Sequence, residues 1–264
     1  MWGSDILITP KYAPILRLIV SYILQRMNLI TTDANHMKDT MVTLGVYPSK
    51  IKIIYFGTDV ERFHPGKRDP RLRKNLDCQN SLIVISLRNL EPLYDIETLI
   101  KAASLVLEEV KNVKFLILGE GSEEMRLKRL AKDLGVRDKI IFKGWVDQEE
   151  LPRYLASSDI YVSTSLSDAG LAASTSEAMA SGLPVVITDF GENIEWIKEG
   201  GGFTFPLRDY KTLAEKITFL AKNEDVRISF GEINRSTIER KNNYYKEMEK
   251  IENEYKNIVK KELS

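Results

Sequence analysis

The sequence predicts an α/β fold whose core is a doubly wound, Rossmann-like parallel sheet. Between residues 81 and 189, short apolar runs alternate five times with segments of helical periodicity. The runs are apolar throughout rather than alternately apolar and polar, so helices are expected on both faces of the sheet. The 264 residues, 43% of them hydrophobic, suffice for a large core.

Each expected element follows from its local pattern. The strands are expected at residues 81–86, 113–121, 139–146, 159–165 and 184–189. The helices are expected at 95–110, 123–136, 149–158 and from about Ser174 onward. Ligands of such sheets bind beyond the carboxyl ends of the strands, so a site is expected there.

Two further regions flank this sheet, and a linker is expected beside the first. Residues 1–60 are expected to form the remnant of another Rossmann-like domain, with helices at 13–30 and 36–44 and strands at 29–33 and 50–57. The linker is expected at 61–70, where Gly, Pro and charged residues show no periodicity. The main domain is then 71–235, and Lys/Glu-rich terminal helices occupy 236–264.

Composition excludes several classes of function. Formal net charge is zero, from 38 basic and 38 acidic residues, so no global field attracts nucleic acid. Cys78 is the only cysteine, which excludes an internal disulfide framework and suits a reducing, cytoplasmic location. His36 and His64 stand in unrelated contexts, so no zinc site is expected. The first residues do not resemble a signal peptide.

Residues 13–30 are the most apolar stretch, but Arg17 and Arg26 interrupt it and it is too short to span a membrane. A buried amphipathic helix is the favoured interpretation, and a peripheral membrane contact is the alternative. With little of its own domain around it, this helix is expected to leave an apolar surface that favours self-association or a partner chain.

Two candidate site segments follow expected strands. Gly119 and Gly121 resemble the start of a dinucleotide fingerprint, but Glu124 stands where its third glycine would be, which favours a tight turn near a ligand cleft. Arg88 follows the first strand of the main domain. It is equally consistent with a phosphate ligand and with a surface ion pair to Glu91 or Asp95.

The segment 165–182, SLSDAGLAASTSEAMASG, places small residues before a helix. Gly170 and its neighbours allow backbone N–H groups to approach an anion, which the helix N-terminus also favours. Glu177, expected on the first turn, suits either ribose hydroxyls or the helix dipole, and the residues alone favour the second.

Several motifs together resemble the group 1 glycosyltransferases, which are retaining nucleotide-sugar enzymes of the GT-B fold. They are EAMASGLPVVITDFGENIEW and GGFTFPLRD, preceded in order by WGSDI, LGVYPSKIKIIYFGTDVERFHP, Arg88, LGEG and FKGWV. The resemblance covers essentially the whole chain. It implies transfer of a sugar from a nucleoside diphosphate to a sugar, lipid or protein acceptor, as in cell-surface polysaccharide or glycolipid synthesis at the cytoplasmic face of the membrane.

The resemblance also implies roles for individual residues. Glu177 would hold the donor ribose, Arg88 would neutralise the diphosphate, and Asp168 would contact the transferred sugar. The donor site would further include Tyr94, Gly119, Gly121, Lys143, Val146, Gly170, Leu171, Ala172, Ser174 and Thr175, with Lys143 to Val146 beside the base. The absence of a D-x-D motif suits transfer without a metal or another cofactor.

The chain departs from the family pattern in three places. The family has an acidic residue eight positions before Glu177, where this chain has Ala169, and the nearest acid is Asp168. Tyr94 stands in the region of a family Lys-Gly pair, so a hydroxyl or a stacking ring replaces the cation. The resemblance of WGSDI also implies that the sequence starts at a point deep inside the family's first domain. This last departure leaves two alternatives, a donor-binding module that needs an N-terminal partner and, less favoured, a GT-B nucleotide-sugar epimerase.

Overall fold

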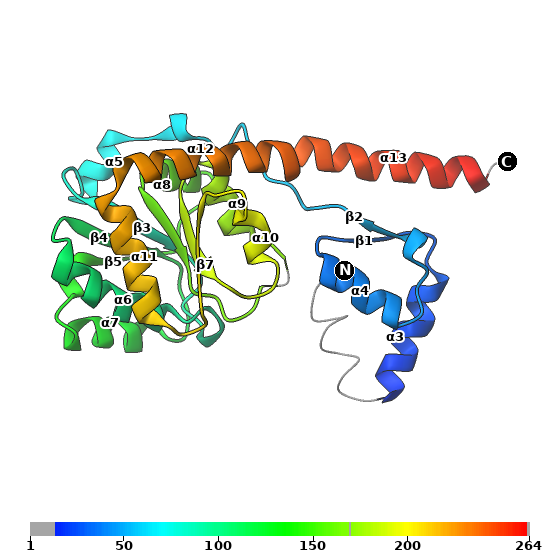
Figure 1. Ribbon diagram of the computed structural model, residues 1–264, viewed down its shortest axis with the longest axis horizontal. Coiled ribbons are helices and arrows are strands. Elements are labelled where there is room, and N and C mark those ends of the chain that lie inside the picture. The colour runs from blue at the N-terminus through cyan, green and yellow to red at the C-terminus, as the bar shows by residue number, and fades with distance from the viewer. Residues whose placement is uncertain (1–13, 169, 263–264) are drawn as a thin grey trace. The chain divides into compact units, whose positions relative to one another are not determined.

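The computed structural model describes residues 14–168 and 170–262, which divide into two compact units. The larger unit comprises residues 58–241. The smaller unit comprises the chain up to Gly57 together with the chain from Asn242 onward. Each unit has a parallel sheet of its own (Figure 1).

The sheet of the larger unit has six parallel strands in the order β5-β4-β3-β6-β7-β8. The strands are β3 (Leu82–Leu87), β4 (Val113–Leu118), β5 (Ile140–Gly144), β6 (Ile160–Ser163), β7 (Val185–Thr188) and β8 (Gly202–Phe205). The chain adds strands outward from β3 in one direction and then, from β6, in the other. This is the doubly wound topology that the sequence predicts, and it places the switch in strand order between β3 and β6.

Helices connect these strands. They are α5 (Pro70–Asn75), α6 (Ile96–Glu109), α7 (Glu124–Asp133), α8 (Leu151–Ala156), α9 (Ala173–Ala180), α10 (Asn193–Ile197), α11 (Tyr210–Lys222) and α12 (Glu224–Lys241), with short 3₁₀ turns η2 (Pro65–Lys67), η3 (Pro92–Tyr94) and η4 (Arg137–Lys139). Local chemistry fixes several starts. Asp69 accepts the Arg71 N–H at 2.8 Å before α5, and Asp209 accepts the Lys211 and Thr212 N–H groups at 3.1 Å before α11.

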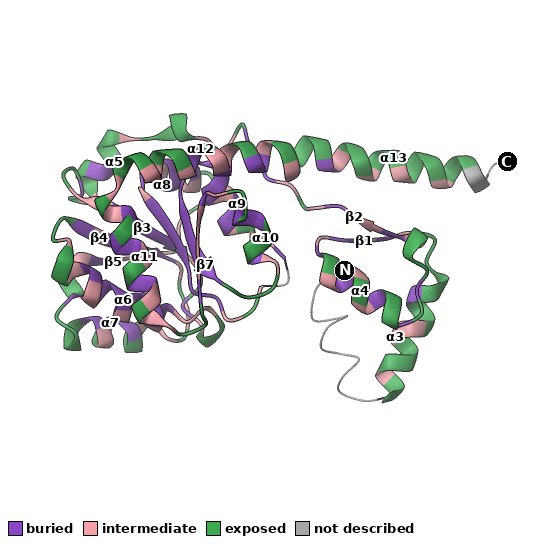
Figure 2. Ribbon diagram, in the orientation of Figure 1, coloured by how far each residue is buried: buried purple, intermediate pink, exposed green. Residues whose placement is uncertain are grey.

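The central strands are buried on both faces (Figure 2). Val84, Val162 and Val186 share one core cluster with the apolar faces of α6, α7 and α11. Alternate residues such as Ile85 and Tyr161 therefore point to the opposite face, where α9 contacts β6 and β7. Because both faces are covered, the strands carry no polar face, which is why they read as continuous apolar runs.

Strand β8 is present in the structure but is not one of the five strands assigned from the sequence. It has four residues, only one of them fully buried, so its sequence carries little of the apolar signal. Its pairing with β7 is nevertheless close, since a Cβ on Gly202 would lie 2.1 Å from the Val185 carbonyl oxygen. Glycine permits the two backbones to approach, and this is a contact that only the folded chain reveals.

The smaller unit contains the helices and strands expected for the N-terminal region. It comprises α3 (Pro14–Arg26), β1 (Ile30–Thr32), α4 (Asn35–Thr43), η1 (Pro48–Lys50), β2 (Ile51–Ile53) and the C-terminal α13 (Tyr244–Glu262). Strands β1 and β2 are parallel. Glu247, 1% exposed on α13, accepts the Tyr55 N–H at 3.0 Å and ties the C-terminal helix to the chain after β2.

The boundaries of the units differ from those expected from the sequence. Residues 61–70, expected as a linker, belong to the larger unit, because Arg235 of α12 donates to the carbonyl oxygens of Val60 and Phe63 at 2.9 and 2.6 Å. At the other end, α12 stays with the larger unit through Lys241 rather than leaving it at residue 236. Side-chain hydrogen bonds hold both segments, and composition does not reveal them.

Helix α3 is not the buried helix that the sequence favours. Among its described residues only Leu24 is fully buried. Its exposed side chains follow helical spacing and form the apolar surface that was expected, namely Ile15, Leu18, Ile19, Tyr22 and Ile23. Among the described helices, none is both long and apolar enough to cross a membrane. The expected self-association through this surface stays a prediction.

Candidate functional site

The switch in strand order brings the carboxyl ends of β3 and β6 together. Val84 and Ile85 of β3 pair with Ile160 and Tyr161 of β6. Arg88 directly follows β3, and Ser163 is the last residue of β6. In an open parallel sheet this is the position at which a ligand crevice forms.

Arg88 is 9% exposed and held from several sides. Its Nε donates to Ser163 Oγ at 3.0 Å and its Nη1 to Ser174 Oγ at 3.4 Å. Its Nη2 forms an ion pair with Asp168. Burial works against its charge, but Tyr161 and Asp168 raise the pKa of Arg88 further above its usual value. The guanidinium is therefore fixed in place as a permanent cation.

Arg88 does not form the ion pair with Glu91 or Asp95 that the sequence left open. Glu91 accepts instead from Ser122, whose N–H and Oγ lie 2.8 and 2.6 Å from its two carboxylate oxygens. Asp95 accepts from Thr98 Oγ1 at 2.7 Å. The partner is Asp168, 80 residues away in the chain.

Tyr94 supplies a stacking ring beside Arg88. The centre of its ring lies 5.1 Å from Arg88 Cζ, within the range of a cation–π contact. Thr164 Oγ1, just past the end of β6, donates to the Tyr94 carbonyl oxygen at 2.7 Å and fixes the turn. The ring of Tyr94 thus lies against Arg88, and whether its hydroxyl or its ring acts on a donor stays a prediction.

Helix α9 begins beside this arginine. Its N-cap, Ala172, has extended backbone angles and makes no side-chain hydrogen bond to the first turn. The hydroxyl groups of Ser174 and Tyr161 lie 2.9 Å apart, and Thr175 Oγ1 donates to Tyr161 at 3.3 Å. Among the described residues, no hydrogen bond caps the N–H groups of Ala173, Ser174 and Thr175, and the use of these groups by an anion stays a prediction.

The other residues predicted in this turn divide by exposure. Thr175, which is 2% exposed, and Gly170 are buried in the protein. Leu171 and Ala172 are half-buried. Ala169, the position of the family's acidic residue, lies outside the described residues.

Glu177 lies on the second turn of α9, not on the first as the sequence suggested. It is the fifth residue of the helix, whose first turn holds no acidic residue. This position removes the interpretation of Glu177 as a capping residue. Burial raises the pKa of the half-buried Glu177 to about 7, and the positive charge of Arg62 opposes part of that rise. Within the described part of the chain, its carboxylate has no hydrogen-bond partner.

Sequence reasoning missed the residues that surround Glu177 and Arg88. The hydroxyl groups of Thr58 and Ser176 form a buried hydrogen bond next to Glu177, and Arg62 donates to the Gln148 carbonyl oxygen. From β6, Ser163 accepts a hydrogen bond from Arg88, and the hydroxyl of Tyr161 lies 2.9 Å from that of Ser174. The one available signal was the hydroxyl-rich end of the apolar run IYVSTS, since polar groups at the carboxyl end of a buried strand indicate a site.

Gly119 and Gly121 serve close packing of two loops. Gly119 has φ of +136°, and a Cβ there would lie 2.5 Å from the Arg88 carbonyl oxygen. A Cβ on Gly121 would lie 2.3 Å from the carbonyl oxygen of Leu90. The loop after β4 is therefore pressed against the loop that carries Arg88, which agrees with a tight turn rather than a dinucleotide fingerprint.

The residues expected beside a base lie at the end of β5. Lys143 is exposed and Val146 half-buried, and Gly144, with φ of +76°, accepts the Gly119 N–H at 2.9 Å. Trp145, which the sequence analysis did not single out, is 65% exposed and donates its N–H to Glu120 at 3.2 Å. In the described residues, no contact joins this group directly to Arg88 or Glu177.

Substituting Gly121 tests the packing of these loops. We expect Gly121→Ala to lower the free energy of unfolding by roughly 1–3 kcal/mol, because the added methyl group meets the backbone of Leu90. Gly66→Ala is the matched control, since its methyl group would meet the movable ring of His64. Denaturant unfolding followed by circular dichroism measures both, and equal losses would contradict the close approach.

The described residues contain no group of three or more His, Cys, Asp and Glu side chains placed to hold a metal ion. The site brings Arg88 and Asp168 together as an ion pair, and Glu177 lies on α9, the helix that begins beside Arg88. Arg88 is a fixed cation and Asp168 is the carboxylate paired to it. Glu177 is a carboxyl group whose pKa is about 7.

Comparison with known proteins places the chain in a family. Residues 68–237 match the family model described as glycosyl transferases group 1. Spore coat protein SA of Bacillus subtilis is 30% identical over 72% of this chain and 54% of its own length. A GDP-mannose-dependent phosphatidylinositol monomannoside mannosyltransferase of Mycobacterium tuberculosis is 24% identical over 85% of this chain and 60% of its own length. The chain thus spans little more than half of each curated relative.

A solved structure shows the same fold. HepE from Anabaena, crystallised with UDP, superposes with a TM-score of 0.85 at 20% identity, covering 96% of this chain and 70% of HepE. This agrees with the GT-B architecture expected from the motifs. Because the family model matches more than half of the sequence, the chain belongs to the group 1 glycosyl transferases.

Proposed function

We propose that this chain binds a nucleoside-diphosphate sugar at the carboxyl edge of its sheet and takes part in transferring the sugar to an acceptor. The observation that carries the proposal is the position of Arg88, a buried and fixed cation beside the uncapped N-terminus of α9. A guanidinium group and the N–H groups at a helix N-terminus both bind the negatively charged oxygens of a diphosphate. Family membership supports it, as do the GDP-mannose dependence named for one relative and the UDP bound in the HepE structure.

Arg88 and Asp168 have linked roles in this proposal. Without ligand the carboxylate of Asp168 neutralises Arg88. A bound diphosphate competes for the guanidinium and frees oxygen atoms of Asp168 to accept hydrogen bonds from hydroxyl groups of the sugar. Glu177, with no hydrogen-bond partner in the described residues, accepts from the ribose hydroxyls.

The proposed transfer proceeds with retention and without a metal ion. The bond between the anomeric carbon and the phosphate oxygen breaks, a bond to the acceptor hydroxyl oxygen forms, and the hydroxyl proton leaves to the diphosphate or to water. The departing diphosphate gains negative charge, which Arg88 and the N-terminus of α9 stabilise from a fixed position. No cofactor is part of this proposal.

The acceptor is proposed more broadly, as a sugar, lipid or protein in cell-surface polysaccharide or glycolipid synthesis on the cytoplasmic side of the membrane. A curated relative that acts on a phosphatidylinositol monomannoside supports a lipid-linked acceptor.

A binding screen tests the donor class. Titration calorimetry with UDP-glucose, UDP-N-acetylglucosamine, GDP-mannose and ADP-glucose is expected to show one preferred donor. Its affinity is expected to be unchanged by a metal chelator, because the charge on the diphosphate is met by protein groups. Absence of binding by all four would contradict the proposed donor site, and loss of binding with chelator would contradict metal independence.

A further inference from the structure

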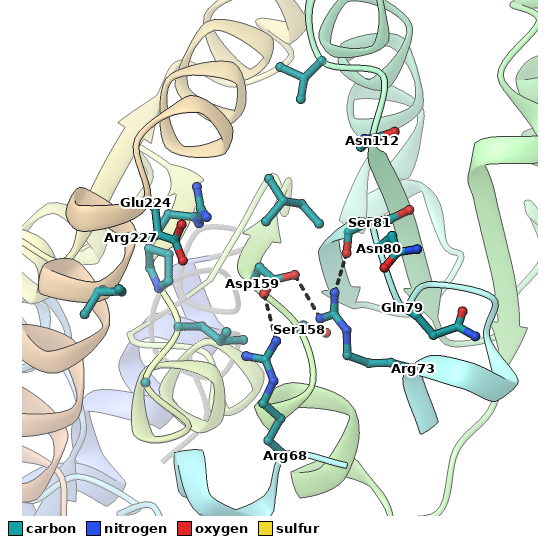
Figure 3. A pocket seen from close by; sticks show the side chains of 16 residues that line it. Arg68, Arg73, Gln79, Asn80, Ser81, Asn112, Ser158, Asp159, Glu224 and Arg227 are labelled. Atoms are coloured by element: carbon teal, nitrogen blue, oxygen red, sulfur yellow. Dashed lines mark hydrogen bonds and ion pairs between the residues drawn. The ribbon is translucent and has the colours of Figure 1, made fainter. Parts of the chain in front are cut away.

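A second cavity lies at the opposite edge of the same sheet, where the strands begin. Its volume is about 540 Å³, within the usual range of small-molecule sites. Ser81 and Leu82 line it at the start of β3, and Ser158 and Asp159 line it just before β6 (Figure 3). The cavity is built entirely from residues of the larger unit.

Three arginines and two carboxylates line this cavity. Arg73 and Asp159 make hydrogen bonds within the protein that hold the start of the sheet in place. Arg73 donates to the Ser157 carbonyl oxygen at 2.7 Å and to Asp159 at 3.1 Å, and Asp159 also accepts the Ile83 N–H at 2.8 Å. Asp159 also forms an ion pair with Arg68, and the three arginines against two carboxylates leave the lining with a net charge of +1.

Arg68 and Arg227 keep most of their donors unused. The side chain of Arg68 is 54% exposed and forms an ion pair with Asp159 at 3.7 Å, a separation too long for a hydrogen bond (Figure 3). Arg227 is anchored through Nη1, which donates to the carbonyl oxygens of Leu220 and Ala221 at 2.6 and 3.0 Å. Among the described residues, Nε and Nη2 of Arg227 have no acceptor. The cavity therefore has a net positive charge, and Arg68 and Arg227 both keep N–H donors that no hydrogen bond among the described residues uses.

The rest of the lining suits hydroxyl groups and a carbon face. Gln79, Asn80 and Asn112 bring side-chain amides, for which the described residues supply no partner. Val110 and Ile228 bring apolar surface to the same cavity. Amides donate to and accept from hydroxyl groups, and guanidinium groups bind phosphate oxygens in pairs.

We propose that this cavity is a second binding site, for a small phosphorylated sugar or polyol. Arg68 and Arg227 bind the phosphate, and the amides of Asn80 and Asn112 bind hydroxyl groups. Free phosphate alone lacks the hydroxyl groups, and an uncharged sugar lacks the charge, so each binds more weakly than the joined molecule.

The site is separate from the one at Arg88. Strands β3 and β6 begin at this cavity, and the residues that follow or end them, Arg88 and Ser163, belong to the other site. Six residues of β3 at about 3.3 Å each place the two sites roughly 20 Å apart. Occupation of one site leaves the residues of the other uncovered.

Titration of the full chain with glucose 1-phosphate tests this proposal, with glucose and inorganic phosphate as separate arms. We expect Arg68→Ala to weaken glucose 1-phosphate binding about tenfold or more, because a hydrogen bond to a charged group is lost. Asn112→Ala is expected to weaken glucose 1-phosphate binding and to leave phosphate binding unchanged. Backbone amide shifts in NMR spectra are expected at Asn80 and Asn112.

Two control variants make the result decisive. Arg71→Ala removes an exposed arginine from the same helix as Arg73 without touching the cavity, and is expected to bind normally. Arg88→Gln combined with Asp168→Asn, which removes both charges of the other site, is expected to leave this binding intact, whereas loss of binding in a folded sample of it would assign the ligand to the other site. No binding at millimolar concentration, or equal binding by Arg68→Ala, would overturn the proposal.

Discussion

Arg88→Ala is expected to weaken binding of the preferred nucleotide sugar by about ten- to a hundredfold. The guanidinium is a cation held at the switch between β3 and β6, and a lost charged hydrogen bond costs about 1.5–3 kcal/mol. Titration calorimetry with the donor selected in the screen measures the change. An unchanged affinity would contradict the role proposed for this residue.

Loss of Arg88 also leaves Asp168 buried without its partner, which by itself costs roughly 3–5 kcal/mol of folding stability. A second variant, Arg88→Gln combined with Asp168→Asn, removes both charges and keeps the polar contacts. It is expected to fold more stably than Arg88→Ala and still to bind the donor weakly. Arg129→Ala, which removes an exposed arginine from α7, is the matched control and is expected to bind normally.

Donor affinity is expected to rise with pH through about 7 in the native chain and to change much less in Glu177→Gln. Burial raises the pKa of Glu177 to about 7, so its carboxyl group changes charge in this range. The ionised form accepts hydrogen bonds from ribose hydroxyls more strongly than the neutral form does. Calorimetry at a series of pH values between about 5.5 and 8.5 measures the dependence. The same slope in both proteins would contradict a role of Glu177 at the ribose.

The same carboxyl group is expected to affect stability with a defined sign. Its pKa in the folded chain, about 7, lies above its ordinary value of 4.5, so the folded state binds the proton more tightly than the unfolded state does. The resulting stability is fully present below pH 4.5 and is lost as pH rises through about 7. Glu177→Gln is therefore expected to gain in free energy of unfolding relative to the native chain as pH rises.

Glu215→Gln, on the exposed face of α11, is the control for both measurements. It is expected to follow the native chain in donor affinity and in stability at every pH. A matching change in this variant would assign the pH dependence to general surface charge rather than to Glu177.

The sequence was most informative where structure follows from local pattern. Continuous apolar runs predicted the buried parallel strands, because a strand covered on both faces has no position that tolerates polar residues. The place of Arg88 followed from the same reasoning, since the residue after such a strand lies at the carboxyl edge whatever the rest of the chain does. The sheet was expected to extend to residue 206, but β8 was not assigned as a strand within it and segment 61–70 was expected as a linker, because their stability comes from distant partners.

The same division holds within the site. The sequence by itself determined the family, the parallel sheet and the placement of Arg88, the α9 turn and Glu177 at one edge of it. Only the tertiary structure decided that Arg88 pairs with Asp168, that Tyr94 stacks on it, and that Glu177 lies on the second turn with a raised pKa. The physical reason is that burial and charge pairing depend on groups such as Asp168, 80 residues from Arg88, which meet only when the chain has folded.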